Sequence, residues 1–170
     1  MKRILLIFII VPLLSFSQQL KVGNFYLENE NLWWEKISDL PKDSLKPSEL
    51  YIKNVLLKKG ITEYKLIEGK IYYKYEKLII GKFQNPVDFN VIVSFKDGRY
   101  RVQAKNIIFN VEGKSMMGYS IPNYTLKSYV VKKNKEKFKT SNIAKRTIAE
   151  FNKNFPKILL IDLDNKNNDW

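Results

Sequence analysis

The sequence predicts a single α+β domain, and two local patterns are the basis of that prediction. Apolar and polar residues alternate on both sides of Asp97-Gly98, which is typical of a β-hairpin because a tight turn needs positive φ at such residues. Helical spacing of apolar residues recurs in two other segments, over residues 47–59 and from Ser141 to Phe155. The whole chain has 170 residues, which is enough for one hydrophobic core rather than two.

The hairpin around Asp97-Gly98 is the clearest local signal in the chain. The apolar residues at every second position are expected to share the covered face of a sheet. They are Phe89, Val91, Val93, Phe95, Tyr100, Val102 and Ala104. The residues between them are polar or charged apart from Ile92, so the opposite face is expected to meet water.

Two segments carry the start and stop signals of helices. The first opens near Pro47 and closes with Lys58 and Lys59 before Gly60. Its apolar residues are expected on one broad face directed at the sheet: Leu50, Ile52, Val55, Leu56 and Leu57. The second follows Ser141, a suitable N-cap, and Pro156 either ends it or begins the next segment. Its apolar positions are Ala144, Ile148, Phe151 and Phe155.

Composition divides the remaining segments. Residues 18–30 are polar and predict a lead-in to a domain over 31–163, which a polar tail over 164–170 follows. Strands are expected at Leu32–Ile37, Tyr64–Ile67 and Ile71–Gly81, with an edge strand at Leu126–Val131. Residues 113–124 predict a loop, and residues 157–163 predict a final strand or helical turn.

This order of elements resembles a family of secreted bacterial proteins, a domain of unknown function described as having a TBP-like fold. The most specific likeness is the segment from Phe95 to Arg101, Phe-Lys-Asp-Gly-Arg-Tyr-Arg, after the helix over 47–59. The likeness covers roughly Leu32 to Phe155, and the chain departs from the family in its long basic segment after Gly113. The resemblance implies a twisted antiparallel sheet of about five or six strands with two helices packed on one face. It brings no assigned activity.

The first eighteen residues have the three parts of a secretory signal peptide. A positively charged start precedes an apolar run, Ile4–Leu14, and small residues stand before Gln18. We expect cleavage after Ser17, which removes residues 1–17. An uncleaved anchor is the alternative, but a spanning helix needs about 20 apolar residues and this run is far shorter. The mature chain is therefore expected in the periplasm, on the outer surface or in the medium, without a transmembrane anchor.

Charge and cysteine content limit the kinds of partner and the sources of stability that the chain can have. The formal net charge is +13 and falls to +11 when Lys2 and Arg3 leave with the signal peptide. A charge of this size favours anionic partners, although a low G+C genome produces the same mixture of lysine, asparagine and isoleucine. The chain contains no cysteine, so stability must come from packing alone.

The residue inventory excludes several kinds of active site. With no histidine and no cysteine, the chain cannot build a triad, a dyad or a zinc site from those side chains. Two close pairs of acids, Asp162 with Asp164 and Glu28 with Glu30, leave an envelope hydrolase using carboxylates as the alternative function. Both pairs fall in expected edges or tails, so we assign no catalytic residue, no metal site and no cofactor.

A run of lysines ahead of the second helix is the sharpest candidate for a binding site. Free amides at a helix start, backed by five ammonium groups, would bind phosphate or carboxylate. The alternative is a solvated charge run in a loop, which is the usual fate of such stretches. The candidate anion site consists of Lys132, Lys133, Lys135, Lys137, Lys139 and Ser141.

Two adjacent tryptophans mark the first expected strand. Because strand side chains alternate, one of Trp33 and Trp34 should face the core and the other should face out. An outward tryptophan beside Tyr72, Tyr73 and Tyr75 would stack on a sugar or on a partner's apolar patch. The alternative is that these aromatic residues simply cover the sheet face opposite the helices.

Together these features predict an exported, non-enzymatic envelope protein whose specific function the sequence leaves open. We expect it to bind an anionic envelope polymer or another envelope protein, through its open sheet face or through the lysine run. Nucleic acid is not an expected partner, because export separates the chain from chromosomal DNA and fold analogy alone is a weak warrant.

Processing provides the first testable prediction. N-terminal sequencing of protein taken from the cell envelope should begin at or within a few residues of Gln18, because Ser17 is the small residue before the expected cut. Finding intact Met1 in the mature pool would contradict the export assignment.

Overall fold

A computed structural model describes residues 20–40, 49–111, 115–116, 119–120, 122–133 and 137–160. The strands are β1 (Lys21–Val22), β2 (Phe25–Glu28), β3 (Asn31–Asp39), β4 (Tyr64–Ile67), β5 (Lys70–Leu78), β6 (Val87–Lys96), β7 (Arg99–Phe109), β8 (Ser115–Met116), β9 (Tyr119–Ser120) and β10 (Tyr124–Thr125). The helices are α1 (Glu49–Lys58), α2 (Leu126–Val130) and α3 (Asn142–Leu159). The expected signal peptide with Ser17 and Gln18, and the expected tail, lie outside the described residues.

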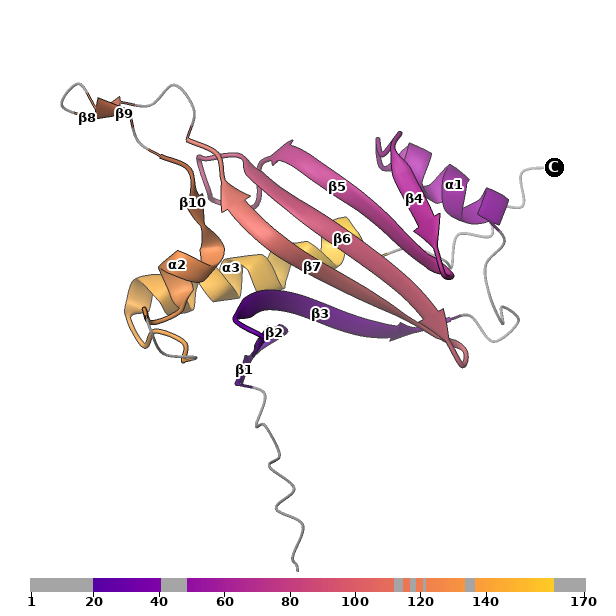
Figure 1. The fold of residues 1–170 in the computed structure, drawn as a ribbon, viewed down its shortest axis with the longest axis horizontal. Coiled ribbons are helices and arrows are strands. Elements are labelled where there is room, and N and C mark those ends of the chain that lie inside the picture. The colour runs from indigo at the N-terminus through magenta and orange to yellow at the C-terminus, as the bar shows by residue number, and fades with distance from the viewer. Residues whose placement is uncertain are drawn as a thin grey trace, which may run out of the picture.

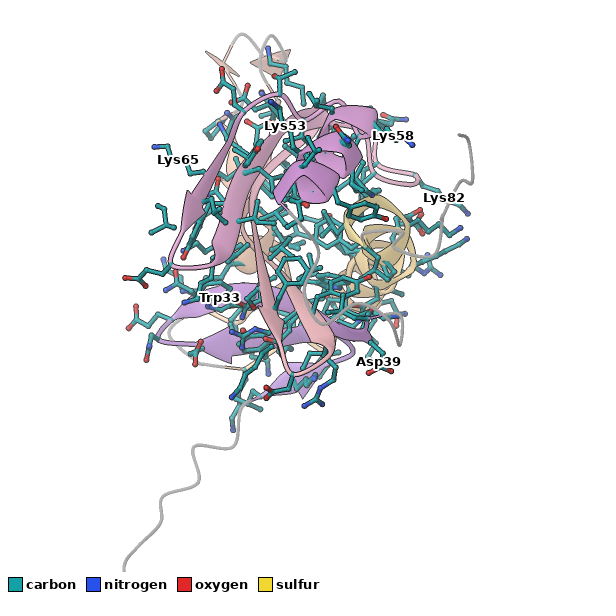
Figure 2. All side chains as sticks on the ribbon, turned by 90° about the vertical axis from the view of Figure 1, so that its right-hand side faces the viewer. Trp33, Asp39, Lys53, Lys58, Lys65 and Lys82 are labelled. Carbon is teal, nitrogen blue, oxygen red and sulfur yellow. The ribbon has the colours of Figure 1, made fainter. Side chains whose placement is uncertain are left out.

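One antiparallel sheet organises the molecule. Its strand order is β1-β2-β3-β7-β6-β5-β4, and β10 pairs with the end of β7 beyond the reach of β3. The long helix α3 runs behind the central strands in Figure 1, and Figure 2 shows α1 on the same side of the sheet. The α+β class and the antiparallel sheet are confirmed. The sheet has eight strands rather than about five or six, because β1, β2 and β10 come from segments expected to be irregular.

The central hairpin forms as its sequence predicts. Asp97 and Gly98 have φ values of 50° and 70°, the positive values that a tight two-residue turn requires. Six of the seven residues expected on the covered face are buried, and Phe95 is partly exposed but packs against the core. The register therefore places Val93 opposite Val102 in the interior, while Asn90 is partly exposed on the other face.

The helix α3 covers the sheet through an aromatic face. Its N-cap is Ser141, whose side chain accepts a hydrogen bond from the Ala144 amide at 3.3 Å. Phe151 and Phe155 are fully buried, and Phe155 lies 5.3 Å from the ring of Trp34. The expected start and apolar spacing of this helix are confirmed.

Pro156 lies inside α3, so both of its expected roles, ending this helix or beginning the next segment, are wrong. The described part of the expected segment 157–163 forms the last turn of the same helix. The helix continues to Leu159, because Phe155 and Leu159 are one turn apart and both are fully buried. The carbonyl of Ile158 accepts a hydrogen bond from Lys59 Nζ at 2.7 Å, which ties this last turn to the end of α1. These interactions outweigh the single backbone hydrogen bond that a proline removes.

The helix α1 is confirmed, but its apolar face is narrower than expected. Ile52 and Leu56 are buried in the core, whereas Leu50 and Leu57 are 68% and 47% exposed. Gly60 closes the helix with a φ of 74°, the left-handed conformation that favours glycine.

The lead-in expected over residues 18–30 is wrong for its described part. Phe25, Tyr26 and Leu27 are buried in β2, which pairs with β3. The turn before it depends on Gly23, which has a φ of 61° and whose added Cβ would collide with the side chain of Asn152. Three consecutive apolar residues were enough to form a strand once a neighbouring strand was available.

The edge strand expected at Leu126–Val131 is also wrong, because Leu126–Val130 forms the short helix α2. The hydroxyl of Thr125 accepts a hydrogen bond from the Ser128 amide at 3.2 Å and starts the helix. Leu126 and Val130, four residues apart, are both fully buried. The expected loop before it contains the β8–β9 pair and the short strand β10.

The register of β6 can be tested by a pair of substitutions. Val93→Asp should lower the free energy of unfolding by about 3 kcal/mol or more, because it buries a carboxylate without a partner. Asn90→Asp should change it by less than about 0.5 kcal/mol, because position 90 is partly exposed. Thermal melts of both variants provide the measurement, and equal losses of melting temperature would show that the faces are misassigned.

Candidate functional site

The sheet face turned away from the helices is the candidate site. We call it the open face and define it by the side chains that alternate with the buried ones. They are Tyr26, Glu28, Trp33, Glu35, Ile37, Asp39, Lys65, Ile67, Lys70, Tyr72, Lys74, Glu76, Asp88, Asn90, Ile92, Ser94, Lys96, Arg99, Arg101, Gln103 and Lys105. In Figure 2, Lys65 projects on the side of the sheet away from α1 and α3.

Basic side chains outnumber acidic ones on the open face. It carries seven cations and five acids, which are Glu28, Glu35, Asp39, Glu76 and Asp88. Arg101 lies 3.8 Å from Glu35, and Lys74 forms an exposed ion pair of 2.7 Å with Glu76 at the strand edge. Lys65, Lys70 and Lys105 form no ion pair within the part of the chain that the structure describes. The face therefore has positive charge that is not neutralised by its own residues.

The Lys74–Glu76 pair is exposed and exchangeable. The hydrogen bond from Lys74 raises its own pKa, and the same bond lowers the pKa of Glu76. Both groups keep their charge at neutral pH. Solvent-exposed pairs of this kind contribute little to stability, so Lys74 can exchange Glu76 for another anion at small cost.

The tryptophans divide between the two faces as expected. Trp34 is fully buried, and its indole Nε1 donates a hydrogen bond to Asn152 Oδ1 at 3.1 Å. Trp33 lies on the open face, where Tyr26 stacks beside it at 6.4 Å between ring centroids. Lys105 Nζ lies 4.9 Å from the Trp33 ring centroid. The ring of Trp33 is therefore already occupied by protein groups, which leaves less of it for a sugar.

The tyrosines of β5 do not gather beside Trp33, so that expectation is wrong. Tyr73 is buried and Tyr75 packs against the core, because both alternate onto the helix side of the sheet. Tyr72 remains on the open face and is partly exposed. The buried hydroxyl of Tyr73 has no hydrogen-bond partner among the described residues, and its burial raises its pKa far above the ordinary value.

A hydrogen-bonded group fixes one end of the open face. Gln103 Nε2 donates to Tyr26 Oη at 2.9 Å and to Glu35 Oε2 at 3.0 Å. Burial, assisted by the charge of Glu35, raises the pKa of Tyr26 to about 12. Tyr26 therefore stays neutral at physiological pH. Glu35 is held by Gln103 and lies beside Arg101.

Two hollows follow the cations across this face. The larger, with a volume of about 1140 Å³, extends around the edge formed by β4 and β5. Its open-face lining is Lys65, Tyr72, Lys74, Glu76, Asn90, Ile92 and Lys105. The smaller, of about 390 Å³, lies near the β6–β7 turn and includes Ile37, Ser94 and Arg101. Both hollows combine basic and apolar side chains.

The predicted lysine site becomes a small loop. Val131 bridges to Phe138, and the backbone of Lys132 donates to the Lys137 carbonyl at 2.9 Å. Lys139 Nζ donates to the carbonyl of Ser128 at 2.8 Å and so serves the end of α2. The exposed members are Lys132, Lys133 and Lys137, while Lys135 lies outside the described residues. Because Lys139 and the Ser141 side chain both have partners within the fold, the anion site stays a prediction with fewer available groups.

The acid pairs do not converge in the described part of the chain. Glu28 and Glu30 are exposed at the β2–β3 turn, and Asp162 and Asp164 lie outside the described residues. Among the described residues, no group of three or more acids could hold a metal ion, and no helix is long and apolar enough to span a membrane.

Sequence reasoning missed the site formed by Lys74, Asn90 and Lys105. Alternation alone indicated that Asn90 and Lys105 share the outer face of the hairpin. It gave no register between β5 and β6, and that register brings Lys74 opposite Asn90. Without the register of β4 and β5, the sequence also did not show that Lys65 and Lys70 lie on this face.

No protein-family model matches this chain, and no curated protein matches it in sequence. Among solved structures, it is similar to a TBP-like protein from Parabacteroides distasonis, with a TM-score of 0.44 and 14% sequence identity. The likeness covers 74% of this chain and 86% of that chain.

Proposed function

We propose that this chain is an exported, non-enzymatic binding module that holds an anionic polymer of the cell envelope on its open face. The observation that carries the proposal is the excess of cations around the two hollows, whose linings together hold seven cations and three acids. Export rests on the signal peptide described above. The partner is anionic because unpaired ammonium groups on a sheet attract and hold negative charge.

The spacing of the cations suits a polymer better than a single small ion. Lys65, Lys74, Lys105 and Arg101 come from three different strands. Neighbouring strands are about 4.8 Å apart and alternate residues along a strand are about 7 Å apart, so these charges form a two-dimensional array. An extended chain with an anionic group on each repeat can contact several of them at once, and such contacts add.

The open face supports this function better than the lysine loop does. The loop has three exposed lysines within the described residues, and its Lys139 serves the end of α2. The open face has its cations on a rigid sheet and beside hollows that exclude part of the solvent. The loop remains a second contact region, and the test below separates the two.

The alternative of a carboxylate hydrolase has no observation in its favour. It requires two acids that line one pocket, with at least one of them buried enough to change its pKa. Within the described residues the buried polar side chains are Asn110 and Thr147, and neither is an acid. We therefore give the chain a binding role without catalysis.

The test compares matched lysine variants of the mature chain. The open-face variant replaces Lys65, Lys70 and Lys105 with glutamine, and the control replaces Lys53, Lys58 and Lys82, which lie on the helix side in Figure 2. Both variants lose the same charge. We expect the wild type to be retained on immobilised polygalacturonate and polyglutamate at low salt and to be released by about 0.5 M salt.

The open-face variant should bind about 100-fold more weakly, because each lysine near an anionic surface contributes about 1 kcal/mol. The control should lose less than about tenfold, and both melting temperatures should stay within a few degrees of the wild type. Equal losses of affinity in the two variants would show that net charge alone explains the binding, which would contradict the proposal. A third variant with glutamine at Lys132, Lys133, Lys135, Lys137 and Lys139 assigns the binding to the loop if it alone loses retention.

A further inference from the structure

The larger hollow on the open face has an ordered arrangement of three side chains. The register aligns Lys105 on β7, Asn90 on β6 and Lys74 on β5 in one row across the sheet. The two lysines are therefore two strands apart, about 10 Å between their backbones, with an amide between them. An anionic group above Asn90 would be within reach of both flexible ammonium groups and of a side chain that can donate and accept hydrogen bonds.

The next row of the same hollow is apolar. Ile92 lies opposite Tyr72, and both are partly exposed and line the hollow. Lys65 follows Tyr72 in this row on β4. A charged row and an apolar row thus lie side by side, about 7 Å apart along the strands.

A charged row beside an apolar row selects a class of ligand. The inference that we draw from this arrangement rests on the proposed function. We infer that the hollow recognises a carboxylated sugar ring of an acidic polysaccharide. The carboxylate lies between Lys74 and Lys105, a ring hydroxyl contacts the amide of Asn90, and the apolar face of the ring packs on Tyr72 and Ile92. A polyanion without a ring uses the cations but leaves the apolar row uncovered.

Lysine is the suitable cation for this arrangement. Its ammonium group is a point charge on a flexible stem and imposes no planar, bidentate geometry on the anion. The adjacent apolar row therefore supplies the discrimination between a sugar acid and another carboxylate of the same charge. Removing the aromatic ring should then affect only ligands that have a ring to place on it.

The experiment compares three soluble polymers that carry one anionic group on each repeat: polygalacturonate, polyglutamate and polyphosphate. Their dissociation constants are measured by calorimetry for the mature wild type and for Tyr72→Thr, Tyr72→Phe and Lys74→Gln. Tyr72→Thr should weaken polygalacturonate binding about tenfold and leave the other two polymers within about twofold. Tyr72→Phe should retain the wild-type preference, because it keeps the ring. Lys74→Gln should weaken all three polymers.

The outcomes separate this inference from the proposed function. If the wild type binds the three polymers equally and Tyr72→Thr changes none of them, the sugar-ring inference fails while polyanion binding stands. If polyphosphate is preferred, the ligand is a phosphate polymer and the inference is overturned. If no polymer is bound at low salt, both the inference and the proposed function are wrong. A circular dichroism melt of Tyr72→Thr shows whether its β5 strand is intact, and Tyr72→Phe provides the same comparison with the ring kept.

Discussion

The packing of the aromatic face of α3 against the sheet is the interaction on which the rest of the structure depends. Phe151 lies within 6.2 Å of Phe25 and 5.2 Å of Phe83, measured between ring centroids, and Phe155 lies 5.0 Å from Phe89. These contacts join the first strands, the central hairpin and the segment after β5 to a single helix. The chain has no cysteine, so no disulfide can replace this packing. Asn152 on the same helix accepts the indole N–H of Trp34 at 3.1 Å, a hydrogen bond that ties the helix to β3.

The same constraint determines which face is available for binding. With α1 and α3 on one side, each strand of the central hairpin has one covered face and one that meets solvent. The alternation that buries Val91 and Val93 also directs Asn90 and Ile92 outward. A shift of one residue in register would exchange the two sets and destroy the core and the cationic row together. Selection on the core therefore keeps the open face in place without any separate scaffold.

Local signals predicted the elements that local chemistry determines. The Asp97-Gly98 turn and the Ser141 cap each place a required conformation or acceptor at one position, and both formed as expected. β2 and α2 were missed for a different reason. A run of three apolar residues in β2 has no period of its own, and α2 has room for only one i, i+4 pair, so tertiary contacts decide both.

The candidate site could be predicted only in part, because its row of Lys74, Asn90 and Lys105 depends on pairing among three strands. The lysine run is visible in the sequence, but the hydrogen bond by which Lys139 serves the end of α2 is not.

If the open face, and not the general positive charge of the chain, holds an anionic polymer, binding should change the environment of that face alone. This can be measured by titrating the ¹⁵N-labelled mature chain with polygalacturonate at low salt and following the chemical shifts of its backbone amides. We expect the largest changes at the open-face positions of β5, β6 and β7, including Lys74, Asn90 and Lys105, and little change in α1 and α3. Changes concentrated at Lys132–Lys137, or spread evenly over both faces of the sheet, would contradict it.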